Sequence, residues 1–330
     1  MAMRGWPLIK LLPVKTNLQF VRFSKAFGAL SAVLVIASIV GCFYPGLNMG
    51  IDFRGGASME VSKPAGQVVA LDDLRGAVRD LGLGDVGVQG IARRGTDVND
   101  GSTAIVRFQI PAGRNQTEVV NQVEAAITAA VGEVAYSDVA VVGSKVSGEL
   151  FTSGMLALGL AVVLMFAYIW FRFEPQFGLG AIAGLMHDVI LVFGLIVLMR
   201  LEFSLNMVAA ILTVIGYSMN DTVVVFDRLR ENLRKYKQMP LREVIDLSIN
   251  ETLSRTVITG VTAIMVLAAL AVFGGEALFG FSIALMAGII IGTYSSVYVA
   301  APIILLWGVR RGGGAADDAT PVKLGMASRP

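Results

Sequence analysis

The residues of this 330-residue sequence that could do chemistry are charged side chains inside long apolar stretches. Asp221 follows an apolar segment and precedes Arg228, the first cation after that segment, by seven residues. On a helix this spacing places Asp221 on the order of 10 Å below a membrane surface. A carboxylate at that depth costs at least about 2.5 kcal/mol to insert. We therefore expect Asp221 to face protein or water and to serve a function.

Arg255 is the expected partner of Asp221. The fourth apolar segment runs inward and the fifth runs outward, so the two charges lie at similar depth. Asp can titrate whereas Arg effectively cannot, so the pair predicts a proton site controlled by the guanidinium. Thr259 continues the Arg255 face by one turn, and Asn220 adjoins Asp221. The alternative is an ion pair that only ties two helices together.

His187 and Asp188 form a second candidate proton site in the third apolar segment. Gly180 and Gly184 share a helix face with Asp188, which places the carboxylate about 18 Å into the membrane near a packed side. A relay role is one interpretation. The other is a hydrogen bond that fixes the histidine tautomer and anchors the helix.

Polar residues at spacings of three and four predict an inward stripe on the fourth helix, formed by Asn206, Ala210, Thr213, Tyr217, Asn220 and Asp221. Ser218 is expected to return a hydrogen bond to its own helix. Small residues predict close backbone packing along the sixth helix at Ala284, Gly288, Gly292, Ser296 and Ala300.

Composition indicates a membrane protein. The mean hydropathy is +0.69. Only 16% of residues are charged, against about 25% in an ordinary soluble domain. The single Cys and single His exclude an intramolecular disulfide, a Cys-based zinc site and a His-cluster metal site. We expect no metal, no cofactor and no nucleic-acid partner.

Six apolar runs predict six spanning helices, at about residues 26–44, 150–171, 177–199, 203–226, 256–273 and 278–307. Residues 1–25 are basic without an acid, which predicts a cytoplasmic N-terminal segment, and residues 308–330 form a cytoplasmic tail. A cleaved signal peptide is the alternative for the first run, because residues 39–42 resemble a lipoprotein processing site.

Residues 45–149 lack a spanning segment and predict an extracytoplasmic α+β domain. The expected order is βαββαβ, the ferredoxin-like arrangement. The strands are expected at about 57–63, 86–93, 103–110 and 135–142, the helices at 71–83 and 117–131, and a polar turn at 95–102.

Four motifs in order resemble the SecD/SecF family of bacterial protein translocase subunits, and the match runs from the first helix to the sixth. These motifs are GIDFRGG at residues 50–56 (with Gly50, Asp52, Gly55 and Gly56), His187-Asp188, GYSMNDTVVVFDRLREN at residues 216–232 (with Gly216, Asp227 and Arg228), and Ser254-Arg255-Thr256.

The resemblance implies a multi-pass protein of the bacterial inner membrane, related to resistance-nodulation-division transporters. Its expected partners are SecD, the SecYEG channel, a YajC-type accessory subunit and unfolded secreted proteins. Asp221 and Arg255 match the family's intramembrane charged pair, which implies use of the proton gradient to promote export.

Three other classes of protein are alternatives. An intramembrane serine hydrolase could use Ser218 and His187, but Asn220 stands where a nucleophile elbow needs its second Gly. An assembly scaffold without proton chemistry is a second alternative. A proton-coupled exporter of small molecules or lipids is the third. We expect a transporter subunit and no enzyme.

Overall fold

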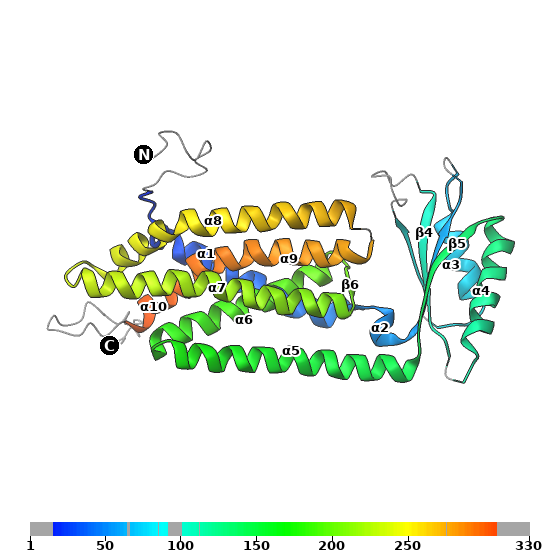
Figure 1. The fold of residues 1–330 in the computed structure, drawn as a ribbon, viewed down its shortest axis with the longest axis horizontal. Coiled ribbons are helices and arrows are strands. Elements are labelled where there is room, and N and C mark those ends of the chain that lie inside the picture. Colours follow the sequence, from blue (N-terminus) through cyan, green and yellow to red (C-terminus); the bar gives the residue numbers. More distant parts are fainter. Residues whose placement is uncertain are drawn as a thin grey trace, which may run out of the picture.

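The computed structural model describes residues 16–64, 67–84, 86–91, 101–111, 113–274 and 276–308. It consists of a long helical bundle with a small sheet domain at one end (Figure 1). The first and the last of the described residues lie at the opposite end of the bundle (Figure 1). The expected segment before residue 16, the turn at 95–100 and the tail beyond 308 lie outside the described residues.

Among the described residues, six helices are long and apolar enough to cross a membrane, which confirms the predicted number. They are α1 (Phe20–Gly41), α5 (Ser144–Arg172), α6 (Pro175–Leu198), α7 (Leu205–Lys235), α8 (Leu241–Phe273), and α9 (Glu276–Ser295) continued by η2 (Ser296–Ala300) and α10 (Ala301–Trp307).

Helices α7 and α8 are longer than the apolar pattern predicts. The expected end near residue 226 and the expected start near residue 256 are wrong because both helices continue as polar extensions that pair with each other. Asn232 donates to Ser248 (3.0 Å), and Arg228 donates to Glu251 (2.6 Å). Hydropathy detects the part of a helix that fits lipid and misses the part that side-chain pairing stabilises in water.

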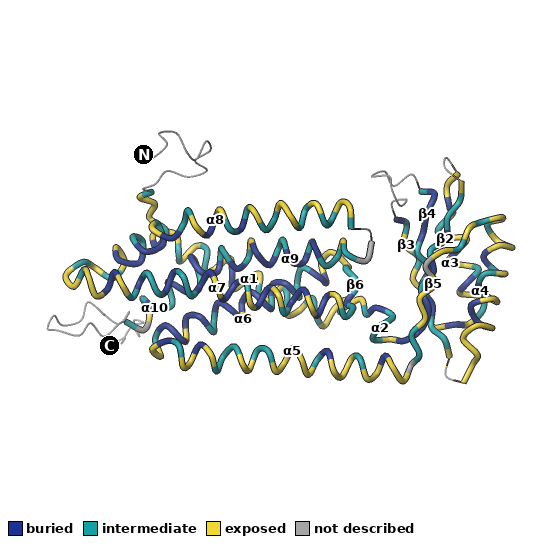
Figure 2. Tube along the Cα trace, viewed as in Figure 1, coloured by how far each residue is buried: buried dark blue, intermediate teal, exposed yellow. Residues whose placement is uncertain are grey.

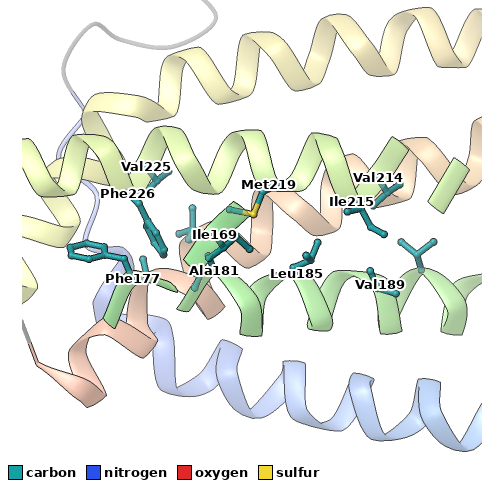
Figure 3. Packing of buried hydrophobic residues seen from close by; sticks show 14 of the residues in the cluster. Ile169, Phe177, Ala181, Leu185, Val189, Val214, Ile215, Met219, Val225 and Phe226 are labelled. Atoms are coloured by element: carbon teal, nitrogen blue, oxygen red, sulfur yellow. The ribbon is translucent and has the colours of Figure 1, made fainter. Parts of the chain in front are cut away.

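Helices α6 and α7 form the centre of the bundle, whereas α5 and α8 are largely exposed (Figure 2). Buried apolar side chains of α6, including Phe177 and Leu185, face those of α7, including Met219 and Phe226 (Figure 3). Lipid offers little hydrophobic driving force, so this contact depends on close packing.

Small residues bring α9 against its neighbours. A Cβ added at Gly292 would lie 2.9 Å from the Cβ of Ser218, and one at Gly180 would lie 2.7 Å from the carbonyl of Ala300. Ala284, Ser296 and Ala300 are buried. The predicted small-residue ridge therefore lies at a helix contact, as expected.

The sheet domain has the predicted ferredoxin-like order. Its strands are β2 (Gly56–Ser62), β3 (Gly87–Ile91), β4 (Thr103–Phe108) and β5 (Ala135–Val142), and its helices are α3 (Leu71–Arg79) and α4 (Gln116–Val131). The spatial order is β3-β4-β2-β5, and all pairs are antiparallel. Both helices pack on one face, over a core that includes Met59, Leu74 and Ile127.

A short junction that the sequence reading missed joins the domain to the bundle. Strand β1 (Asn48–Met49) pairs in parallel with β6 (Glu202–Phe203), and the one-turn helix α2 (Ile51–Arg54) follows β1. Two-residue strands carry too little periodicity to be predicted.

Candidate functional site

Asp188 lies at the centre of a hydrogen-bonded cluster built by α6, α7 and α9. Its carboxylate is fully buried, with an exposed fraction of 0%. Ser218 of α7 and Ser295 of α9 both donate to Oδ2, the latter over 2.7 Å, and Oδ1 lies 2.9 Å from His187 Nδ1. Three helices thus meet at one carboxylate.

His187 extends the cluster toward α1. Its ring packs against that of Tyr294, with centroids 6.0 Å apart. The hydroxyl of Tyr294 lies 2.8 Å from that of Ser31 and donates to the carbonyl of Phe27. His187 Nε2 is buried and has no hydrogen-bond partner among the described residues. One imidazole nitrogen therefore contacts the carboxylate, and the other is a buried polar atom that no described residue satisfies.

Asp221 lies about one turn after Ser218 on α7 and is 3% exposed. The Thr293 hydroxyl of α9 donates to its Oδ2 over 3.2 Å. Thr293 and Ser295 are two residues apart on the same helix, so α9 contacts both buried carboxylates. The hydroxyl of Thr222 on α7 lies 3.4 Å from that of Ser296.

The structure does not bring Arg255 into contact with Asp221. Within the described ranges no ion pair of 4.0 Å or less joins them, and Arg255 is exposed on α8 while still acting electrostatically on the carboxylate. The prediction of a direct ion pair between Asp221 and Arg255 is therefore wrong. Equal depth on two helices does not fix the rotation of either helix, and α7 turns Asp221 toward α9.

The predicted inward stripe of α7 is wrong in its orientation. Asn206, Thr213 and Asn220 are exposed, whereas Ala210 and Asp221 are buried. The buried face is centred on apolar residues and Ser218, because the ridge of α9 admits close approach there. On α8, Thr259 is half-buried and donates to the carbonyl of Arg255.

Ser218 and Ser295 are the site residues that the sequence reading missed. Ser218 was expected to bond to its own helix, but it donates to Asp188 instead. A serine in an apolar helix carries no sign of which partner it finds. The usable signal was the adjacency of Ser295 to the ridge position Ser296, since a residue beside a ridge also lies near the facing helix.

The cluster does not have the order that a serine hydrolase needs. The carboxylate of Asp188 lies between Ser218 and His187, so the described contacts contain no hydrogen bond from serine to histidine. Such a hydrogen bond activates the nucleophile in a triad.

The glycine motif connects the sheet domain to α7. The carboxylate of Asp52 accepts the N–H of Leu205, the first residue of α7, over 2.9 Å. An acid at a helix N-terminus satisfies an unpaired N–H and complements the helix dipole. Gly55 and Gly56 have φ angles of 72° and 134°, which glycine adopts readily. Gly50 donates to the carbonyl of Phe203 (3.0 Å).

The remaining motif residues lie toward the other end of α7. Asp227 accepts from Arg172, the last residue of α5, over 2.6 and 2.8 Å. Arg228 donates to Glu231 and Glu251 over 2.6 Å each. Gly216 is exposed, and a Cβ there would meet no heavy atom within 4 Å, so its glycine has no steric explanation among the described residues.

No three metal-ligating His, Cys, Asp or Glu side chains cluster within the described part of the chain. The arrangement can instead hold and exchange protons, because carboxylate, imidazole and hydroxyl groups are in contact across three helices.

Comparisons with known proteins agree with this architecture. Residues 122–310 match the family of protein export membrane proteins SecD/SecF, C-terminal, and residues 45–62 match the SecD/SecF GG motif. The chain is 45% identical over 312 residues to protein translocase subunit SecF of Cereibacter sphaeroides, covering 94% of this chain and 95% of that protein. It is 39% identical over 310 residues to the SecF of Rickettsia akari, covering 94% and 97%.

Two solved structures are similar as well. The crystal structure of SecDF from Thermus thermophilus, a translocon-associated membrane protein, matches with a TM-score of 0.77 and 30% identity. The match covers 90% of this chain and 40% of that chain. SecDF in its super-membrane-facing form matches with a TM-score of 0.60 and 29% identity. The predicted family is thus confirmed: this chain is a multi-pass membrane protein that belongs to the SecD/SecF family of protein translocase subunits.

Proposed function

We propose that this chain couples proton movement across the inner membrane to the export of unfolded proteins, acting with SecD at the SecYEG channel. A YajC-type subunit is a further expected partner. The single observation that carries the coupling is the burial of two carboxylates, Asp188 and Asp221, among hydroxyl groups of a membrane-spanning bundle.

Hydroxyl groups suit a carboxylate that changes its protonation state. They donate to the charged carboxylate and can accept from the protonated acid, so the site is satisfied in both states. No Lys or Arg lies within 4.0 Å of Asp188 or Asp221 in the described parts of the chain. A fixed cation would hold the charge permanently, whereas a proton can enter and leave.

Protonation changes how α9 is held. Thr293 and Ser295 connect α9 to Asp221 and Asp188, so loss of either negative charge weakens the hydrogen bonds between α9 and its neighbours. One charge that moves through 100 mV yields about 2.3 kcal/mol, enough to bias a conformational equilibrium of a few kcal/mol.

The glycine motif transmits this repacking to the sheet domain. Helix α7 carries Asp221 and Ser218, and its first N–H is held by Asp52 of the motif that leads directly into β2. A shift of α7 therefore moves the start of the central strand. The sheet domain changes its orientation against the emerging polypeptide.

Polar residues exposed on the spanning helices indicate that a partner within the membrane covers them. Asn220, Thr213 and Arg255 are exposed on α7 and α8, the last being a charge within a spanning helix. A charge facing lipid is costly, so this face needs protein cover. We assign SecD as the partner that covers it, since the solved SecDF chain is more than twice the length that this chain matches.

The scaffold alternative is tested by Asp221→Asn, which keeps the side-chain volume and removes the titratable group. We expect export to lose its dependence on the proton gradient while the amount of assembled complex stays unchanged. Asp188→Asn should have a similar effect, and Asp80→Asn, on the exposed surface of the sheet domain, should have none. Gradient-dependent export by both bundle variants would favour the scaffold.

A further inference from the structure

A basic groove lies at the end of the bundle away from the sheet domain. It has a volume of about 450 Å³ and is lined by Arg172, Asp227, Arg230, Glu231, Arg234 and Lys235. The helix turn from α5 to α6 and the end of α7 come together there (Figure 1). The proton-coupling proposal uses none of its cations.

Ion pairs leave the groove with unneutralised positive charge. Asp227 contacts both Arg172 (2.6 Å) and Arg230 (3.9 Å), and Glu174 also lies 3.9 Å from Arg230. Glu231 pairs with Arg228, outside the lining. In the described part of the chain Arg234 and Lys235 have no carboxylate within 4.0 Å. The groove therefore favours an anionic occupant.

The part of α5 next to Arg172 carries exposed apolar and aromatic side chains. Trp170 is 61% exposed and Phe171 is 88% exposed, both directly before Arg172. Further along α5, Leu164, Val163 and Leu160 are also exposed. Exposed Trp and Phe next to Arg at the end of a spanning helix are typical of the boundary between acyl chains and headgroups. An exposed apolar surface of α5 thus begins within two residues of Arg172, which lines the groove.

We propose that this groove binds an anionic phospholipid, with its phosphate between Arg230, Arg234 and Lys235 and its acyl chains along the exposed face of α5. Guanidinium and ammonium groups form strong charge-assisted hydrogen bonds to phosphate oxygens. A soluble phosphate would use the cations but leave the adjoining apolar face unused. A basic pocket between spanning helices is a recognised form of lipid headgroup site.

Fluorescence quenching tests this assignment because Trp170 is exposed and lies two residues before Arg172, which lines the groove. The full chain carries Trp6→Phe and Trp307→Phe, so that Trp170 is the single reporter. It is reconstituted with a small fraction of brominated phosphatidylglycerol or, in a parallel sample, of brominated phosphatidylcholine. We expect stronger quenching by the anionic lipid at equal fraction, as selective binding enriches it beside Trp170.

The decisive variant is Arg234→Gln with Lys235→Gln, which leaves the ion pairs of Arg172 and Arg230 intact. Each basic side chain near an anionic surface contributes about a fivefold gain in affinity. We therefore expect this variant to bind the anionic lipid at least about tenfold more weakly. The matched control is Arg22→Gln with Lys25→Gln, two exposed residues on α1 with the same total charge. The control variant should keep the stronger quenching by the anionic lipid.

Three outcomes would overturn the proposal. Equal quenching by the two lipids would show no selectivity for anionic headgroups. Full reversal of the selective quenching by glycerol 3-phosphate in solution would assign the groove to a soluble phosphate. Absence of quenching by either lipid would show that protein covers this face of α5.

Discussion

At the scale of single residues, the buried carboxylates of this bundle are surrounded by hydroxyl groups and not by cations. Ser218 and Ser295 hold Asp188, and Thr293 holds Asp221. Hydrogen bonds to a charged group contribute about 1.5–3 kcal/mol each. The hydroxyls are therefore expected to matter for stability as well as for proton exchange.

Ser218→Ala should destabilise the bundle by about 1–3 kcal/mol, because it leaves a buried carboxylate with one donor fewer. The measurement is thermal unfolding of the purified protein in detergent. Ser282→Ala is the matched control, since Ser282 is fully buried on α9 and its hydroxyl has no partner among the described residues. Equal loss of stability in both variants would contradict the importance of the Asp188 hydrogen bond.

Asp221→Asn and Arg255→Met should act almost independently on stability. The two side chains form no ion pair, so the coupling free energy in a double-mutant cycle should be below about 0.5 kcal/mol.

The double variant should also fail to regain gradient-dependent export, because a proton site cannot be restored by two uncharged residues. A coupling of several kcal/mol would indicate a direct pair, and wild-type export by the double variant would oppose the coupling proposal.

At the scale of elements, α7 and the glycine motif connect the buried carboxylates to the sheet. Asp52 holds the first N–H of α7, and the ring of Phe53 packs on those of Phe151 and Phe203, both at centroid distances of 5.5 Å. A second link crosses directly from β4 to β6, where Arg107 pairs with Glu202 over 2.7 Å.

The pair of Arg107 and Glu202 predicts how the sheet domain is held. Arg107→Glu should broaden the distance distribution between spin labels at Val139 and Leu198, both exposed, because like charges then face each other. Adding Glu202→Arg should restore a narrow distribution. Arg75→Glu, which breaks an exposed ion pair within α3, is the control and should leave it unchanged. A distance distribution that broadens only in the Arg75→Glu control would contradict this role of the pair of Arg107 and Glu202.

At the scale of the whole molecule, the start of α1 and helix α10 lie at one end of the bundle and the sheet domain lies at the other (Figure 1). Basic residues gather at the first of these ends: Arg172 ends α5, Arg230 lies in the last part of α7, and Arg242 lies at the start of α8. The positive-inside rule predicts that this end faces the cytoplasm.

Reporter fusions test this topology. A reporter after Gly113, in the sheet domain, should be extracytoplasmic, whereas one after Lys237, between α7 and α8, should be cytoplasmic. Fusions after each position are compared by compartment-specific enzyme activity at matched expression. Both reporters on the same side would contradict the six-helix topology.

The sequence by itself determined the number of spanning helices, the βαββαβ order of the domain and the buried state of Asp188 and Asp221. These follow from local patterns: runs of apolar residues, alternation along strands, and the cost of a charge in an apolar segment. The small residues at Gly288 and Gly292 likewise predicted a close helix contact, which α9 makes with α7.

Only the tertiary structure decided which side chains the carboxylates meet. The rotation of α7 about its axis turns Asp221 toward Thr293 and leaves Asn220 exposed, and no spacing along one helix fixes that angle. Partners separated by about a hundred residues, such as Asp188 and Ser295, meet because two small-residue surfaces pack together. Such contacts depend on the shapes of several helices at once, which a local pattern does not contain.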